Sequence, residues 1–288
     1  MDGQGNSSEV SEVSRELRRR LAAGPSDRLA EAVGQIIDHA FQVLATLRPS
    51  PEELDAFVQF LTDVGYATDS RRQEWVLLTD IFGLADGILE NGRRDAPGVT
   101  PSTLPGPFYR GDAPQLPLGA NLCRNGAGNP LLVQGQVVGP DKDPLAGAEI
   151  EVWHANDTGR YENQDPDNQP EHNLRGRFIA DAAGRFQFST IRPGGYSLPD
   201  DGPVGRLARR LGLSLDRPAH IHFAVSARGH RRLVTAIFDG ADPAIARDAL
   251  FAVKPDLIGD FGAGATGILN VVLILERDDA PQPDDPKG

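Results

Sequence analysis

Residues 217–225, which read RPAHIHFAV, have the alternation of a β-strand. Every second side chain is apolar, which is the period of a half-buried strand; these are Ala219, Ile221, Phe223 and Val225. His220 and His222 therefore share the opposite face. Two residues along a strand span about 6.6 Å, so the two imidazoles can converge on one metal ion. The pattern predicts a candidate metal site, and two ordinary half-exposed histidines are the alternative.

The composition is that of a globular protein with one large domain or two smaller ones. The chain has 288 residues, of which 39% are hydrophobic and 24% are charged. No apolar run approaches the ~18 residues of a membrane helix, and no secretory signal opens the chain, so we expect neither a membrane span nor secretion. The single cysteine, Cys123, is typical of a reducing cytoplasm. The net charge of -12 argues against nucleic acid as a partner.

Helical spacing of apolar residues dominates the first part of the chain. It predicts four helices, over residues 10–21, 29–44, 50–65 and 69–90. Ser50 and Glu53 form a capping box at the start of the third helix. The first ninety residues are therefore expected to be helical.

From residue 93 onward, proline and glycine are frequent and short alternating segments predict strands. The predicted strands cover residues 131–138, 148–154, 176–180, 185–188, 219–227, 232–238 and 268–275. Asp181–Gly184 is expected to form a hairpin turn, and helical insertions are expected at residues 204–213 and 243–252. We predict a mainly β protein with a helical N-terminal domain (1–92), a β-sandwich domain (93–276) and an acidic flexible tail (277–288).

Several motifs occur in an order that is characteristic of one family. They are GxY at 159–161, YxxP at 196–199, DGPVG at 201–205 and RPAHxH at 217–222, with RQE at 72–74, TLPGPFY at 103–109 and NLRG at 173–176. This order resembles the intradiol ring-cleaving dioxygenases, which include catechol 1,2-dioxygenases and hydroxyquinol 1,2-dioxygenases. The likeness covers nearly the whole chain.

The resemblance implies a non-haem ferric ion, Fe(III), as the cofactor. Its ligands would be Tyr161, Tyr196, His220 and His222. Two phenolates, two neutral imidazoles and a bound hydroxide suit a hard ion of charge +3. A phenol with a pKa near ~10 ionises at neutral pH only beside a strong Lewis acid. Zinc held by His220, His222 and a carboxylate is the competing interpretation, although the sequence singles out no carboxylate.

The resemblance also implies the reaction. An aromatic diol is cleaved by O2 between its two hydroxylated carbons, giving a muconate- or maleylacetate-type dicarboxylic acid. The substrate would displace Tyr196, which then accepts a phenolic proton. Arg217 would lie beside the ring and stabilise developing negative charge; a structural ion pair is the alternative. Arg217 and Tyr196 are therefore the candidate catalytic residues.

The resemblance implies a substrate pocket around the metal. Its residues would be Leu77, Asp80, Leu104, Pro105, Gly106, Pro107, Phe108, Leu198, Pro199, Arg217 and Leu250. Asp80 would accept a hydrogen bond from a third ring hydroxyl, which favours hydroxyquinol over catechol; a charge on the helix surface is the alternative. Ala236 and Pro105 depart from the residues usual in the family. Chlorocatechols and pyrogallol therefore stay open as substrates.

The helical N-terminal domain carries the expected partners. By the resemblance it pairs across a two-fold axis to form a homodimer, and it encloses an apolar tunnel that can hold a phospholipid. A non-enzymatic β-sandwich binding module with a helical dimerisation arm is the alternative from another class. The joint presence of Tyr161, Tyr196, His220, His222 and Arg217 in family order argues against that alternative.

Overall fold

A computed structural model describes residues 11–24, 27–69, 72–91, 98–264 and 266–278. The chain divides into two compact units, residues 1–66 and residues 67–288. Among the described residues, no helix combines the length and the apolar character needed to cross a bilayer. Most of the expected acidic tail lies outside the described residues.

The first unit is helical, as the sequence indicated. Its helices are α1 (Glu12–Ala22), α2 (Arg28–Leu47) and α3 (Pro51–Tyr66). The predicted capping box at α3 is confirmed, because the Ser50 N–H donates to the Glu53 carboxylate at 2.8 Å and the Glu53 N–H donates to the Ser50 hydroxyl at 3.3 Å. Many large apolar side chains of α2 and α3 are exposed in the single chain: Leu29, Val33, Ile36, Val43, Leu44, Leu47, Leu54, Phe57 and Val58.

The predicted helix over residues 69–90 is wrong in one respect. The structure has two shorter helices, α4 (Glu74–Ile81) and α5 (Leu84–Asn91), separated at Phe82 and Gly83. Gly83 has a φ of +69°, a left-handed conformation that glycine adopts without penalty. A Cβ at this position would also lie 3.2 Å from the ring of Phe251. The break between the two helices therefore accommodates the ring of Phe251, which is far away in sequence.

Salt bridges and a hydrogen bond attach both short helices to the rest of the second unit. Glu74 of α4 accepts a hydrogen bond from the Val204 N–H at 2.9 Å, at the start of α6 (Pro203–Leu211). Lys254 forms ion pairs with Asp86 and Glu90 of α5. These contacts place α4 and α5 in the compact unit of residues 67–288, whereas the predicted domain boundary at residue 92 stays a prediction.

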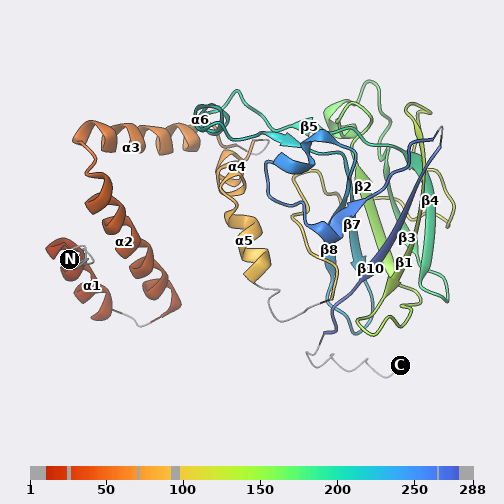
Figure 1. Ribbon diagram of the computed structural model, residues 1–288, viewed down its shortest axis with the longest axis horizontal. Coiled ribbons are helices and arrows are strands. Elements are labelled where there is room, and N and C mark those ends of the chain that lie inside the picture. The colour runs from red at the N-terminus through yellow and green to blue at the C-terminus, as the bar shows by residue number, and fades with distance from the viewer. Residues whose placement is uncertain (1–10, 25–26, 70–71, 92–97, 265, 279–288) are drawn as a thin grey trace, which may run out of the picture. The chain divides into compact units, whose positions relative to one another are not determined.

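The second unit is built on two sheets that form a sandwich, as predicted (Figure 1). The smaller sheet has the order β10-β1-β4, from β10 (Gly267–Ile274), β1 (Pro130–Val138) and β4 (Arg185–Ile191). The larger sheet has the order β3-β2-β7-β8-β9, from β3 (Arg175–Ile179), β2 (Glu149–His154), β7 (His220–Ser226), β8 (Leu233–Asp239) and β9 (Ile258–Gly259). A separate pair joins β5 (Tyr196–Ser197) to β6 (Asp216–Arg217).

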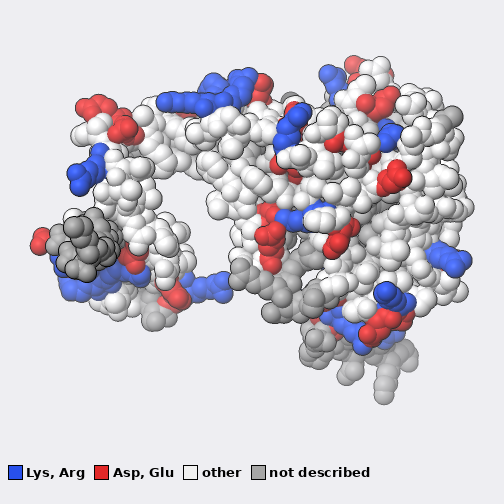
Figure 2. Space-filling model, in the orientation of Figure 1, with Lys and Arg blue, Asp and Glu red and all other residues white. Residues whose placement is uncertain are grey.

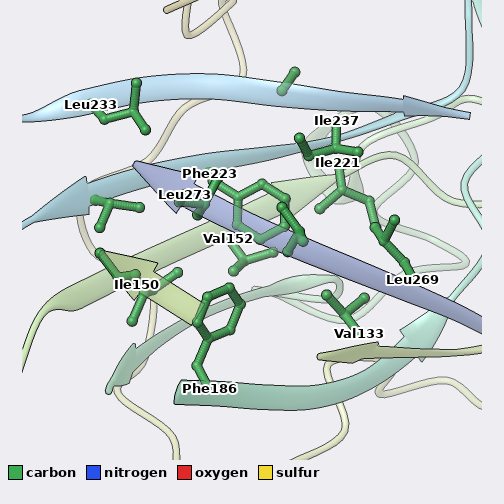
Figure 3. Packing of buried hydrophobic residues seen from close by; sticks show 14 of the residues in the cluster. Val133, Ile150, Val152, Phe186, Ile221, Phe223, Leu233, Ile237, Leu269 and Leu273 are labelled. Carbon is green, nitrogen blue, oxygen red and sulfur yellow. The ribbon is translucent and has the colours of Figure 1, made fainter. Parts of the chain in front are cut away.

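The hydrophobic core consists of the side chains from the facing sides of these sheets. Figure 3 shows Val133 of β1, Phe186 of β4 and Phe223 of β7 within one cluster. The apolar residues that alternate along β7, Ile221, Phe223 and Val225, are completely buried. Replacing such a core phenylalanine by alanine typically costs about 3–5 kcal/mol. The core thus holds β7 in a rigid position.

Two local predictions need correction. Asp181–Gly184 does form a turn, in which the Gly184 N–H donates to the Asp181 carbonyl at 3.0 Å. It does not join paired strands, because β3 and β4 belong to different sheets. The helix expected over residues 243–252 is only a 3₁₀ turn, Pro243–Arg247. Two further 3₁₀ turns cover Glu162–Gln164 and Pro255–Leu257.

Charged side chains on the visible face of the molecule include both signs (Figure 2). Basic residues gather where Figure 1 places α6, the helix that carries Arg206, Arg209 and Arg210. Arg209 forms an ion pair with Asp200, and Arg206 donates to the Asp201 carbonyl at 2.6 Å. These contacts lie on the exposed side of α6, and the helical insertion expected at residues 204–213 is confirmed.

Candidate active site

β7 carries the two predicted histidine ligands through the middle of the larger sheet. The strand was expected to be half-buried, but it is buried on both faces from His220 to Val225. In register, His222 lies between Trp153 of β2 and Ala236 of β8. The expectation of half-exposure was wrong because other segments of the second unit cover the histidine face.

The two imidazoles converge at their Nε2 atoms. These atoms are 3.2 Å apart, and the ring planes make an angle of 87°. Nδ1 of His220 lies 2.7 Å from the Pro218 carbonyl oxygen. A proton on that nitrogen is donated to the carbonyl, which leaves Nε2 with a free lone pair.

Both imidazoles are neutral at physiological pH. Burial lowers the pKa of His220 to about 3, and the positive charge of Arg217 adds to this effect. Burial also lowers the pKa of His222 well below its usual value, with further contributions from His220 and Arg217. The neutral form is the one that binds a metal ion.

Two phenols complete the cluster. Tyr161 precedes the 3₁₀ turn after β2, and Tyr196 begins β5. The centroids of the two phenol rings are 6.3 Å apart, and that of Tyr196 is 5.8 Å from the His220 ring. Burial raises the pKa of both tyrosines; Tyr196 adds to the rise at Tyr161, and Arg217 opposes the rise at Tyr196.

This donor set fits a hard, highly charged cation. Buried phenols ionise only if a strong positive charge replaces their proton, and neutral imidazoles supply the remaining lone pairs. The zinc alternative required a carboxylate beside the histidines. Over the ranges that the structure describes, no group of three His, Cys, Asp or Glu side chains is placed to hold a metal.

The segment of residues 103–109 runs along this cluster. The Thr103 N–H donates to the Val234 carbonyl at 2.9 Å, which attaches the segment to β8. The Phe108 ring stacks on Tyr161 with centroids 4.4 Å apart. Gly106 has a φ of +68°, and a Cβ there would lie 3.9 Å from Nε2 of His222.

Arg217 lies in β6, paired in register with Tyr196 of β5. Its Nε donates to Oδ1 of Asp248 at 2.8 Å, and both side chains are buried. The ion pair that the sequence left as an alternative therefore exists, and it lies beside a candidate metal ligand. Breaking a buried pair from one side leaves an uncompensated charge, which costs about 3–5 kcal/mol.

Known proteins with matching sequences place this chain in a family. A family model described as "Dioxygenase" matches residues 106–271, and one described as "Catechol dioxygenase N terminus" matches residues 26–93. The chain belongs to the intradiol ring-cleavage dioxygenase family. Members of this family are enzymes that cleave catechol-type diols.

Individual relatives are similar over most of their length. A hydroxyquinol 1,2-dioxygenase of Rhizobium sp. is 43% identical over 234 residues, which cover 81% of this chain and 79% of the relative. A catechol 1,2-dioxygenase of Candida albicans is 33% identical over 250 residues, covering 85% and 82%. The crystal structure of a hydroxyquinol 1,2-dioxygenase from Pseudomonas putida superposes with a TM-score of 0.87 at 31% identity, covering 92% and 98% of the two chains.

Asp80, the predicted substrate-selecting residue of this dioxygenase, is half-buried on α4. Burial raises the pKa of its carboxyl, and the positive charge of Arg217 opposes that rise. Asp80 therefore lies within electrostatic reach of Arg217. No side chain in the described part of the chain forms a hydrogen bond or ion pair with its carboxylate. By contrast, Glu74 forms an ion pair with Arg72, and Asp86 forms one with Lys254.

The other predicted pocket residues differ in exposure. Leu77, Leu104, Leu198, Gly106 and Phe108 are half-buried, Leu250 is buried, and Pro105, Pro107 and Pro199 are exposed. Their contact with a substrate stays a prediction. Ala236, one of the two departures from the family pattern, is completely buried next to His222.

Sequence reasoning missed several residues around the ligands. Arg175 is buried, and its Nε donates to the Glu162 carboxylate at 2.7 Å. Its Nη1 donates to the Phe108 carbonyl at 2.6 Å. The guanidinium carbon lies 5.6 Å from the centre of the Tyr161 ring. The NLRG motif contained Arg175 but indicated no role for it. Trp153 stacks on His222 with centroids 4.8 Å apart and an interplanar angle of 7°. Nothing in the sequence pointed to this stacking.

Proposed function

We propose that this chain is an iron(III) dioxygenase that cleaves hydroxyquinol between two adjacent hydroxylated carbons. The observation that carries the proposal is the convergence of two neutral imidazoles, with Nε2 atoms 3.2 Å apart, beside the phenols of Tyr161 and Tyr196. A trivalent iron is held by such a set of two anionic oxygens and two neutral nitrogens. Family membership supports the same cofactor.

Tyr161, Tyr196, His220 and His222 would hold the iron, which would supply a Lewis acid that favours ionisation of the diol. The chain contributes the proton transfers and the electrostatic environment. Because burial raises the pKa of Tyr196, its phenolate is a strong base. Its phenolate oxygen would accept a proton from a substrate hydroxyl and would become a neutral phenol.

Arg217 provides a fixed positive charge next to Tyr196. Its side chain is buried, and charge stabilisation is strong where water is excluded. We infer that its guanidinium faces the substrate ring and stabilises negative charge that develops during attack by O2. Phe108, stacked on Tyr161, closes the same site from the side of residues 103–109.

Substrate choice is assigned to Asp80. Among the residues that the structure describes, no basic side chain forms an ion pair with its half-buried carboxylate, although the positive charge of Arg217 acts on it. A third hydroxyl of hydroxyquinol would supply a hydrogen bond. Replacing Asp80 by alanine is expected to lower the ratio of kcat/KM for hydroxyquinol over catechol by roughly 10- to 150-fold, the value of one hydrogen bond to a charged group. Oxygen uptake with hydroxyquinol, catechol, chlorocatechols and pyrogallol measures this ratio.

The matched control is Asp256→Ala, which removes an exposed carboxylate of the turn Pro255–Leu257 and should leave the ratio unchanged. A native preference for catechol or a chlorocatechol, or a ratio that does not move in Asp80→Ala, would refute the role of Asp80. Absence of ring cleavage for every diol would refute the proposed function itself.

We infer that the protein is a homodimer that pairs through its N-terminal helices. The exposed apolar side chains of α2 and α3 support this, because broad apolar stripes are normally buried against a partner. Sedimentation at micromolar concentration should show a dimer, and Phe57→Glu should shift it toward monomer by placing a charge on that face. The matched control, Gln59→Glu on the same helix, should stay dimeric.

A monomeric native protein would contradict the dimer. The proposed phospholipid is tested separately, by solvent extraction of the purified protein and mass spectrometry of the extract. We expect phospholipid in the extract, and a lipid-free extract from intact dimer would contradict the proposal that the protein binds a lipid.

A further inference from the structure

The ion pair between Arg217 and Asp248 is isolated from solvent on both sides. The Arg217 side chain is 5% exposed and the Asp248 side chain 3% exposed. Nε of Arg217 lies 2.8 Å from Oδ1 of Asp248. A guanidinium donates through Nε and both Nη atoms in a rigid plane. Fixing Nε therefore fixes the direction in which the Nη atoms point.

Asp248 is itself held in place by the backbone that follows it. Its Oδ2 accepts a hydrogen bond from the Ala252 N–H at 2.8 Å. The intervening turn is closed by a hydrogen bond of 3.2 Å from the Phe251 N–H to the Asp248 carbonyl. Phe251 adopts a φ of +57°, a conformation that side chains larger than glycine seldom adopt. The backbone is therefore strained at Phe251, within the turn that holds the Asp248 carboxylate in place.

A second anchor comes from the break between α4 and α5. The ring of Phe251 packs against Gly83, where a Cβ would lie 3.2 Å from Cδ2 of the ring. The turn of residues 248–252 therefore packs next to the C-terminal end of α4, the helix that carries Asp80. Asp80 and Asp248 act on Arg217 from two elements: Asp248 by a direct ion pair, and Asp80 through its field.

We propose that Asp248 is a positioning residue, which holds Arg217 with its Nη atoms directed at the substrate ring. The inference rests on the proposed ring cleavage, in which Arg217 touches the substrate. Asp248 occupies the Nε edge of the guanidinium, and the same guanidinium also forms a hydrogen bond with Tyr196, the ligand that the substrate would displace.

The test is Asp248→Asn, which keeps the size of the side chain but has a single oxygen to accept from both Arg217 and Ala252. We expect kcat for ring cleavage to fall roughly 10- to 100-fold, the range for losing a residue that orients a functional group. KM should change by less than about threefold, because the residues that would hold the iron, and through it the diol, are unchanged. Iron content and the visible absorption band should match those of the native protein.

The matched control is Asp216→Asn. Asp216 precedes Arg217 in β6, but its carboxylate accepts from Ser197 and forms an ion pair with Arg247, both at the surface. A surface pair contributes little, so kcat should stay within about twofold of native. A loss in this control equal to that in Asp248→Asn would overturn the assignment to Asp248.

A double-mutant cycle with Arg217→Gln separates positioning from simple destabilisation. If Asp248 acts through Arg217, the double variant Arg217→Gln/Asp248→Asn has the same kcat as Arg217→Gln within about threefold. The double variant also removes both buried charges, so it can be assayed even if Asp248→Asn alone does not fold. A further tenfold or greater loss in the double variant would overturn the proposal.

Two other outcomes are also decisive. An Asp248→Asn protein with native kcat would overturn the positioning role while leaving the proposed function intact. A native protein without any ring-cleaving activity would overturn the proposed function, and this inference with it.

Discussion

Replacing Arg217 by lysine is expected to lower kcat for ring cleavage by about 10²- to 10³-fold, the range for losing one oxyanion-type contact. Lysine keeps the positive charge but lacks the planar fork. It cannot both occupy the place of Nε beside Asp248 and direct further donors at the substrate ring. Steady-state oxygen uptake measures kcat, and iron analysis should show native loading, because the candidate ligands are unchanged.

The control for Arg217→Lys is Arg247→Lys. Arg247 is an exposed arginine that forms an ion pair with Asp216, and lysine serves such a surface pair nearly as well. Its kcat should stay at the native value. Native turnover in Arg217→Lys would reduce Arg217 to the structural ion pair that the sequence left as an alternative.

Loss of His222 should remove the metal and, with it, the activity. Native protein is expected to contain about one iron per chain and to be red to purple through charge transfer from phenolate to iron. In His222→Ala the iron content should fall to less than about a tenth of native. Mutation of residues that only orient metal ligands already lowers metal affinity about 10- to 100-fold, and His222 would be a direct ligand. Elemental analysis and the visible spectrum provide two independent readings.

Two further variants sharpen the iron prediction. His39→Ala removes an exposed histidine of α2, whose Nδ1 is 3.3 Å from the side chain of Gln42, and should leave iron and colour unchanged. Tyr196→Phe removes one phenolate donor and should shift or bleach the visible band. A colourless, iron-free native protein with full ring-cleaving activity would contradict the iron site, and a colourless inactive one would favour the binding-module alternative.

The sequence predicted β7 and its pair of histidines because strand periodicity is a local property. Alternation of side chains follows from backbone geometry alone, so Ile221 and Phe223 had to lie opposite His220 and His222. All seven predicted strands are present, with ends that differ by a few residues. The two-residue strands β5, β6 and β9 were missed, because two residues are too few to show a period.

Burial of the histidine face could not be predicted in the same way. Alternating apolar residues describe one covered face, and nothing local reports what covers the other. In the structure, Trp153 stacks on His222, and the segment of Gly106 runs beside it. Those residues are distant in sequence, so the low pKa of both imidazoles is a property of the folded chain alone.

The same reason explains the error at Gly83 and the missed role of Asp248. The spacing of apolar residues supported one helix over residues 69–90, but Phe251 requires the space that the left-handed Gly83 leaves open. Arg217 and Asp248 are 31 positions apart, and many acidic residues were equally near in sequence. Which one pairs with Arg217 depends on how the turn after residues 243–247 packs against Gly83, between α4 and α5.

The sequence by itself therefore determined all seven longer strands, most of the helices, the order of the motifs and the types of the candidate ligands. These follow from side-chain periodicity and from donor chemistry, both of which act over a few residues. Only the tertiary structure decided which strands share a sheet, which charges are buried in pairs and which side chains enclose the site. Such contacts join residues far apart in the chain, and the free energy that selects them comes from the burial of the whole sandwich core.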